Sequence, residues 1–171
     1  VHNKGLGFCG FSKIRSYDYT GNVVEIVDQT LDPEKRGVVT KVETRHKSVR
    51  DAPYSTTVST YDNNSTTYGK LNPRLTQSET ADELTGVNTT VSYAYDSFDY
   101  PTSVQTSRRI GSGESQTETV YRTYQHNVVL SKYVLGIVTE ESVVKKDNGN
   151  SSLSWKERSV TTYDDLFRPL T

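Results

Sequence analysis

Three glycines near the start of the chain, Gly5, Gly7 and Gly10, have the G-x-G-x-x-G spacing of a dinucleotide-binding turn. Such a turn needs a buried strand before it and a helix after it, because the helix N-terminus must meet a pyrophosphate. Only four residues precede Gly5, and residues 11–19 alternate with the two-residue period of a strand. We therefore expect no nucleotide cofactor. The glycines are expected to shape an irregular approach to the first strand.

The residues that most often bind metals or act as nucleophiles are few and scattered. The three histidines, His2, His46 and His126, show neither H-x-H nor H-E-x-x-H spacing. Cys9 is the single cysteine, which excludes an internal disulfide, and no signature of a cysteine nucleophile surrounds it. We expect no metal site and no catalytic cysteine.

Paired carboxylates raise the possibility of a glycosidase, at Asp82-Glu83, Glu140-Glu141 and Asp164-Asp165. Neighbouring residues of a strand point to opposite faces, so these pairs cannot flank one scissile bond without an intervening turn. The acidic segment 147–150 lacks the closing Glu of a calcium loop and is typical of a hairpin turn. We expect no catalysis in this segment, so the chain is not expected to be an enzyme.

Composition points to a polar β protein. Only 32% of the 171 residues are hydrophobic, yet the chain holds 12 Tyr, 23 Thr and 19 Ser. Tyr and Thr favour a pleated surface, and disordered chains are poor in aromatic and β-branched residues. The net charge of −1 gives no field for nucleic acid, and no apolar run is long enough for a membrane helix. Because the chain contains no Met, we expect it to be a piece of a longer protein.

Turn residues divide the chain into five expected antiparallel hairpins, or ten long strands. The segment 33–37 is too short to be more than a turn. We expect an all-β fold of consecutive hairpins whose open edge lies near 136–146 or 153–164. The expected strand pairs are 10–19 with 22–30, 37–49 with 53–62, 74–84 with 87–96, 101–110 with 116–125, and 136–146 with 153–164.

The expected strands end alike, in the dipeptide Tyr-Asp or its variant Tyr-Gln. The copies are Tyr17-Asp18, Tyr61-Asp62, Tyr95-Asp96, Tyr124-Gln125 and Tyr163-Asp164, with successive spacings of 44, 34, 29 and 39 residues. We expect each Asp to cap its turn by accepting backbone N–H bonds. Each Tyr ring is expected to cover a neighbouring strand while its hydroxyl stays in water. Units of this kind stack into larger arrays.

The last copy, TYDDLFRPLT at 162–171, resembles the YDxxGRPLT form of the YD repeat, with Arg168 and Pro169 matching the motif. That repeat occurs in rearrangement-hotspot (Rhs) proteins, in the B and C components of insecticidal toxin complexes, and in teneurins. The opening segment 5–30 is similar to the stretch that leads into the repeats of toxin-complex B and related chains. Phe167 and Asp99 stand where the repeat usually has Gly.

The resemblance implies a long twisted sheet that forms a hollow shell around a C-terminal toxin domain. It implies a lead-in with the first hairpin at 1–36 and one continuous YD-repeat sheet at 37–171. The chain is then expected to be bacterial, secreted or at the cell surface, with the rest of its own array and an enclosed C-terminal domain as partners. The alternative is a cell-surface module that binds carbohydrate or protein. Tyrosines clustered on one exposed face would favour that alternative, and tyrosines between strands would favour the wall.

Overall fold

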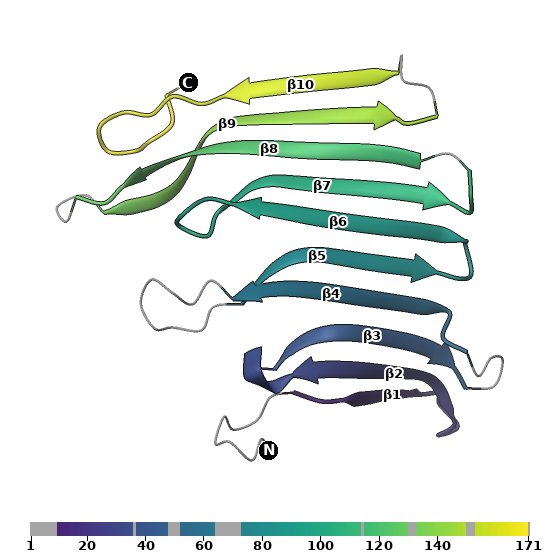
Figure 1. Cartoon of the computed structure of the whole chain (residues 1–171). Coiled ribbons are helices and arrows are strands. Elements are labelled where there is room, and N and C mark those ends of the chain that lie inside the picture. Colours follow the sequence, from purple (N-terminus) through teal and green to yellow (C-terminus); the bar gives the residue numbers. More distant parts are fainter. Residues whose placement is uncertain are drawn as a thin grey trace. The chain divides into compact units, whose positions relative to one another are not determined.

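The computed structural model describes residues 10–35, 37–47, 52–63, 73–113, 115–129, 133–149 and 153–170. Most of these residues lie in ten strands (Figure 1). The strands are β1 (Lys13–Tyr17), β2 (Val23–Asp32), β3 (Val38–His46), β4 (Ser55–Asn63), β5 (Pro73–Asp82), β6 (Val87–Tyr95), β7 (Pro101–Ile110), β8 (Ser115–Asn127), β9 (Val134–Asp147) and β10 (Ser154–Val160).

The strands hydrogen-bond to one another in the order of the sequence, from β1 to β10, in one sheet. The expectation of ten strands in five consecutive antiparallel hairpins is therefore confirmed. The one helical element among the described residues is a single 3-10 turn, Pro33–Lys35, in the segment expected to be no more than a turn. The described residues include no helix long and apolar enough to span a membrane.

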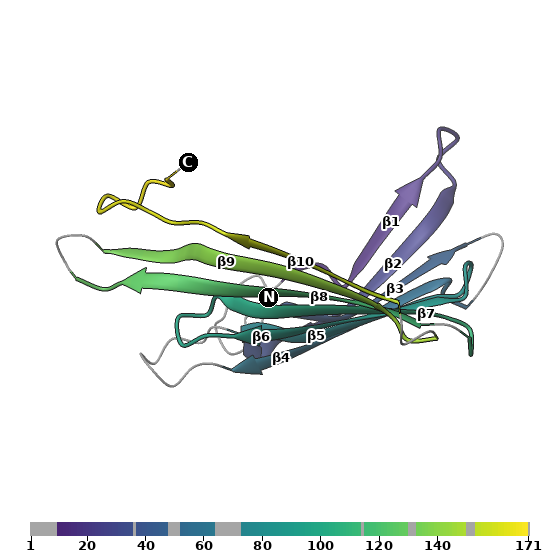
Figure 2. The same cartoon turned by 90° about the horizontal axis from the view of Figure 1, so that it is seen from above.

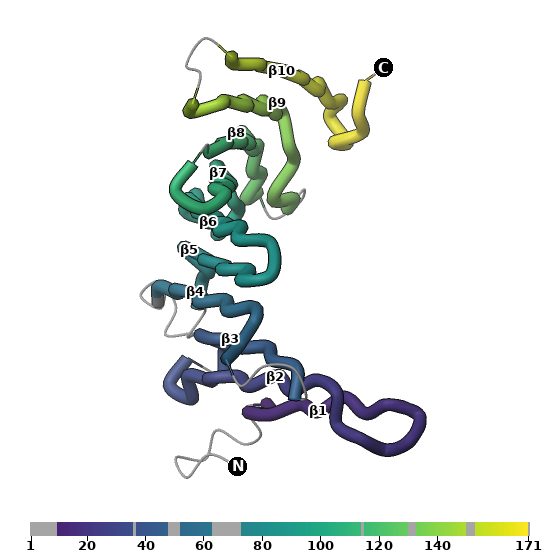
Figure 3. The backbone as a smooth tube through the Cα atoms, turned by 90° about the vertical axis from the view of Figure 1, so that its right-hand side faces the viewer, coloured from purple at the N-terminus to yellow at the C-terminus, as the bar shows by residue number. Residues whose placement is uncertain are grey.

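The chain forms two compact units, 1–90 and 91–171, and β6 crosses the division between them. Within each unit the strands follow one another in one layer, as the end-on view of Figure 3 shows. Figure 2 shows β8 and β9 side by side along much of their length, in agreement with their long register. The boundary expected after residue 36 stays a prediction.

A single layer buries little, and the described residues include no fully buried hydrophobic side chain. The most buried side chains among them are polar, at Thr119 and Ser142, which are 5% and 9% exposed. Most apolar side chains of the strands are instead half-buried against their neighbours in the sheet. The low hydrophobic content therefore suits a sheet whose two faces both remain partly in contact with solvent.

The expected role of the opening glycines can be followed at one position. Gly10 has a φ of +116°, a conformation that side chains disfavour, and it lies just before β1. It therefore shapes the approach to the first strand, as expected. Gly5, Gly7, His2 and Cys9 lie outside the described residues.

Candidate functional site

The Tyr-Asp copies at Asp18, Asp96 and Asp164 form three turns of the same geometry. In each, Oδ1 of the Asp accepts the backbone N–H of the residues two and four positions later, at 2.8–2.9 Å. The N–H of the Asp in turn donates to the carbonyl four positions later, at 2.9–3.0 Å. The expectation that the Asp caps its turn is confirmed at these three positions.

The residue three positions after each of these Asp residues has a left-handed backbone. Its φ is +83° at Gly21, +67° at Asp99 and +59° at Phe167. A side chain in this conformation costs about 1 kcal/mol or more relative to Gly. Asp99 and Phe167 nevertheless adopt it, so the departures from Gly leave the turn geometry intact. The two hydrogen bonds to the Asp carboxylate favour the turn and offset this strain.

Asp62 differs from these three because it lies within β4, and the residues that follow Asn63 are outside the described residues. Arg74 of β5 binds it in a bidentate ion pair, with Nε–Oδ1 and Nη2–Oδ2 distances of 3.1 and 2.8 Å. The hydrogen bonds from Arg74 hold the pKa of Asp62 below its usual range. Arg168 also binds Asp164, but its Nε and Nη2 atoms both lie 2.7 Å from one oxygen, Oδ2. An Arg thus binds the Asp of two of the Tyr-Asp copies.

Three strand ladders, β2–β3, β4–β5 and β8–β9, share a β-bulge that the sequence analysis missed. In each, the following strand holds one extra residue, always a Thr, whose hydroxyl donates to the carbonyl of a Thr on the preceding strand. The sequence signal is a Thr directly before the Tyr or Leu, and a Val-Thr or Leu-Thr in the next strand. The Thr pairs are Thr40 with Thr30, Thr76 with Thr60, and Thr139 with Thr123, at 3.2, 3.0 and 3.2 Å.

The bulges also show which strand ends belong to the repeat, because each lies beside the end of an even-numbered strand. Three of the Tyr-Asp or Tyr-Gln copies lie at the ends of β4, β6 and β8, and a fourth follows β10. Tyr17-Asp18 instead lies at the end of β1, an odd-numbered strand, and therefore where the even-numbered strands begin rather than where they end. The copy that matches the others in position is Leu31-Asp32, at the end of the even-numbered strand β2. Asp32 there accepts the N–H of Glu34 at 3.0 Å. Leu in place of Tyr hid this copy in the sequence.

The expectation that the Tyr hydroxyls of the repeat stay in water is wrong for two copies. The hydroxyl of Tyr124 donates to the carbonyl of Pro101 at 3.0 Å, and that of Tyr163 donates to the carbonyl of Val138 at 2.8 Å. Both carbonyls belong to the neighbouring strand that each ring covers. A ring that lies flat over a strand brings its hydroxyl within reach of that strand's backbone. These tyrosines therefore tie adjacent strands together.

Aromatic side chains of the second unit form a cluster near the ends of β6 and β8. We call it the His126 cluster; its members are Phe98, Tyr100, Tyr124 and His126. The ring of His126 lies 4.4 Å from that of Phe98 and 5.3 Å from that of Tyr100. The Nε2 atom of His126 lies 2.7 Å from Oδ2 of Asp96, and its side chain is only 13% exposed. This histidine had no assigned role in the sequence analysis because its partners come from distant segments.

The hydrogen bonds of His126 determine which ring nitrogen carries the proton. Its Nδ1 accepts the backbone N–H of Gly136 at 3.1 Å, so Nδ1 is unprotonated and Nε2 donates to Asp96. Burial alone would raise the pKa of Asp96, but hydrogen bonds from Tyr100, His126 and Phe98 outweigh burial and lower that pKa. Both ring nitrogens make hydrogen bonds, so this arrangement leaves His126 no free nitrogen for general base catalysis.

The carboxylate pairs considered above have structural partners. Glu140 binds Arg158 and Glu141 binds Arg122, each with an Nε–oxygen distance of 2.7 Å. Asp82 accepts the backbone N–H of Leu84 in a turn. Their carboxylates do not converge on a common point, in agreement with the alternation of strand residues. Among the described residues, no group of three or more His, Cys, Asp or Glu could hold a metal ion.

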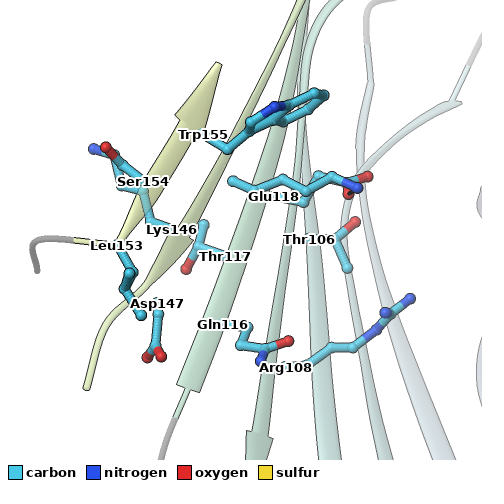
Figure 4. Close-up of a pocket in the computed structure, with 11 residues that line it drawn as sticks. Thr106, Arg108, Gln116, Thr117, Glu118, Lys146, Asp147, Leu153, Ser154 and Trp155 are labelled. Carbon is cyan, nitrogen blue, oxygen red and sulfur yellow. Dashed lines mark ion pairs between the residues drawn. The ribbon is translucent and has the colours of Figure 1, made fainter. Parts of the chain in front are cut away.

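A cavity of about 540 Å³ lies on the sheet formed by β7, β8, β9 and β10 of the second unit (Figure 4). Trp155 of β10 borders it and is 49% exposed. Lys145 lies over the Trp155 ring, 5.6 Å from its centroid, and pairs with Glu118 at 2.9 Å. In this cavity an exposed aromatic ring borders a hollow of ligand size.

The described residues thus contain repeated turns, a structural histidine and a polar cavity on the sheet of the second unit. The turns and the histidine fix the ends of strands, and the cavity is a candidate binding site. No family model matches this chain, and neither does any curated protein.

Proposed function

We propose that this chain is a segment of an Rhs/YD-repeat β-wall that encloses or presents a C-terminal toxin or effector domain, with no catalysis in the segment. The observation that carries the proposal is the repeated structure at the strand ends, in which a Tyr-Asp pair recurs near the ends of β4 and β6 and after β10, with an Arg bound to the Asp at the first and last of these. Turns at Asp96 and Asp164 share their hydrogen bonds although their sequences differ between the Tyr and the next strand. Such a repeat lengthens a sheet one hairpin at a time.

The placement of the repeat tyrosines also favours a wall over a binding face. Tyr61, Tyr95, Tyr124 and Tyr163 are half-buried, and two of them bond to the backbone of a neighbouring strand. A binding face built from these tyrosines would instead present their rings and hydroxyls to solvent. The repeat tyrosines therefore support the sheet itself.

The last described residues pair with the segment that directly follows β10. Pro169 pairs with Tyr163, and the N–H of Leu170 donates to the carbonyl of Thr162 at 2.8 Å. The segment at the start of β5 pairs in the same way, with Leu75 opposite Tyr61. By this analogy, a strand that continued from Leu170 would run antiparallel along β10.

The outer edge of β10 can accept such a strand. Hydrogen bonds join Thr161 to Thr139 and Asp147 to Leu153. The register of β10 with β9 therefore gives the odd-numbered residues of β10 the backbone hydrogen bonds to β9. The N–H and C=O groups of Lys156, Arg158 and Val160 therefore point outward. The edge expected at 136–146 or 153–164 is thus at β10, since β9 is paired on both sides.

Limited proteolysis of the parent protein tests the enclosure. A domain inside a closed wall is cleaved only after the wall opens, so we expect it to survive protease concentrations that digest the same domain expressed alone. A variant parent with Asp96→Ala and Asp164→Ala, which removes two turn caps, should expose the domain earlier. Equal cleavage of the free and the attached domain would contradict enclosure.

A further inference from the structure

The register of the second unit aligns polar side chains with the single tryptophan. Thr106, Glu118, Lys145 and Trp155 lie opposite one another in a row across β7, β8, β9 and β10. Residues two positions along a strand share its face, so the next row, Arg108, Gln116 and Asp147, faces the same way. All seven residues border the cavity of about 540 Å³.

Several of these polar groups have unused hydrogen-bonding capacity. Within the described part of the chain, the side chains of Thr106, Arg108 and Gln116 make no hydrogen bond or ion pair. In the view of Figure 4, Arg108 and Gln116 lie at one end of the cavity and Trp155 at the other. Together they offer N–H and O–H donors and amide and hydroxyl acceptors around the hollow.

The ring of Trp155 gives the cavity its one broad apolar surface. It is 49% exposed, although it is the only tryptophan of the chain and large aromatic rings are usually more buried. Lys145 packs over this ring and pairs with Glu118, which holds both charged side chains beside the aromatic surface. Because Trp155 is 49% exposed, its ring remains accessible to a ligand with an apolar face and polar edges, beside the ammonium group of Lys145.

We propose that this cavity binds a short pyranose saccharide, with one sugar ring stacked on Trp155. A pyranose ring presents C–H groups on its face and hydroxyls around its rim, so it suits an aromatic ring bordered by hydrogen-bonding side chains. Gln116 and Arg108 bond the hydroxyls of the next sugar, and the cavity volume lies in the range of small-ligand sites. The site is separate from the proposed wall function and does not depend on it.

A peptide strand is the competing occupant, and the geometry disfavours it at this place. An added strand bonds to the outward backbone groups of β10, whereas the seven aligned side chains lie on a face of the sheet across four strands. The two occupants would therefore use different surfaces. Blocking the edge with Val160→Pro should prevent strand addition and leave saccharide binding unchanged.

Tryptophan fluorescence tests the proposal directly, because Trp155 is the only tryptophan. The protein is titrated with trisaccharides of β-1,4-linked glucose, β-1,4-linked N-acetylglucosamine and α-1,4-linked galacturonate. At least one of them should shift the emission of Trp155 in a saturable manner, and calorimetry should give the same affinity.

Matched variants locate the site. Trp155→Ala and Gln116→Leu should each weaken the binding measured by calorimetry, the first by about tenfold or more, as for the loss of a central aromatic anchor. The control is Tyr121→Ala, because Tyr121 is equally exposed, at 49%, but faces the other side of β8. Circular dichroism verifies that each variant keeps its β signal. A site with a Kd of about 1 mM would be largely occupied at about 10 mM sugar, so absence of binding by all three sugars at that concentration would overturn the proposal. Equal loss of binding in Tyr121→Ala, or loss of binding in Val160→Pro, would overturn it as well.

Discussion

Replacing Gly136 with Ala should destabilise the second unit more than any other single Gly→Ala change at a described left-handed glycine. Gly136 has a φ of +77° and lies beneath the ring of Tyr100. A Cβ at this position would overlap Cε1 of Tyr100 and lie 2.5 and 2.9 Å from its Cζ and Cδ1. The ring would have to move, although it packs on Tyr124 and His126 at centroid distances of 5.3 Å.

The expected loss has two parts. Placing a side chain in the left-handed region costs about 1–2 kcal/mol. Displacing the packed ring of Tyr100 costs a further ~1–3 kcal/mol, the usual penalty for overpacking. Gly136→Ala should therefore lower the free energy of unfolding by about 2–5 kcal/mol, a large part of the stability of an ordinary domain.

Gly111→Ala is the matched control for the backbone part. Gly111 belongs to the same unit and has a φ of +56°, but a Cβ there would meet nothing within 4 Å. Its cost should stay near 1–2 kcal/mol, from the backbone alone. Urea unfolding followed by the fluorescence of Trp155 reports on the second unit, which holds the only tryptophan.

A double-mutant cycle decides whether Tyr100 is the cause. In a Tyr100→Leu background, which removes the ring atoms that Cβ would meet, Gly136→Ala should cost no more than Gly111→Ala. Equal costs for Gly136→Ala and Gly111→Ala in the unmodified protein would refute the packing of Tyr100 over Gly136 and the His126 cluster built on it.

Three further substitutions test the repeated contacts. Thr139→Val keeps the side-chain shape but removes the hydroxyl bond across the bulge, so it should cost about 0.5–1.5 kcal/mol in urea unfolding, against a smaller loss for Thr106→Val, whose hydroxyl has no partner among the described residues. Tyr124→Phe should cost about 1 kcal/mol because it leaves the Pro101 carbonyl without its hydroxyl donor; an unchanged midpoint would contradict that bond. Asp96→Asn should weaken the dependence of the free energy of unfolding on pH below about pH 4. Because the folded pKa of Asp96 is lowered, its contribution is present above the unfolded value of about 3.9 and is lost as the pH falls through the folded value; an unaltered profile below about pH 4 would contradict this.

The strand pairs could be predicted because period-two alternation and turn residues are local signals. Runs such as Val87–Tyr95 alternate, and the Gly and Asp residues between runs define the hairpins. The Asp caps were predictable for the same reason, since an Asx-turn involves only residues within four positions of Asp96 or Asp164. Composition also indicated a polar β protein.

The parts of the site that sequence reasoning missed depend on partners distant in the chain. His126 bonds to Asp96 and Gly136, and no spacing rule connects the three. The first copy of the repeat was misassigned because Tyr17-Asp18 matches the motif while Leu31 replaces the Tyr of the copy at the end of β2. The register that aligns residues from four strands at the cavity depends on bulges and loop lengths, which the alternation of each strand alone does not set.

Amide hydrogen exchange along β10 tests the proposed wall most directly. In the isolated chain, the N–H groups of Lys156, Arg158 and Val160 point outward and should exchange fast, whereas those of Glu157 and Ser159 bond to β9 and should exchange slowly. If the chain is part of a continuous wall, the three outward groups should become as slow as Glu157 and Ser159 in the parent protein, because the next strand pairs with them. Fast exchange of Lys156, Arg158 and Val160 in the parent, with Glu157 and Ser159 still protected, would contradict the account.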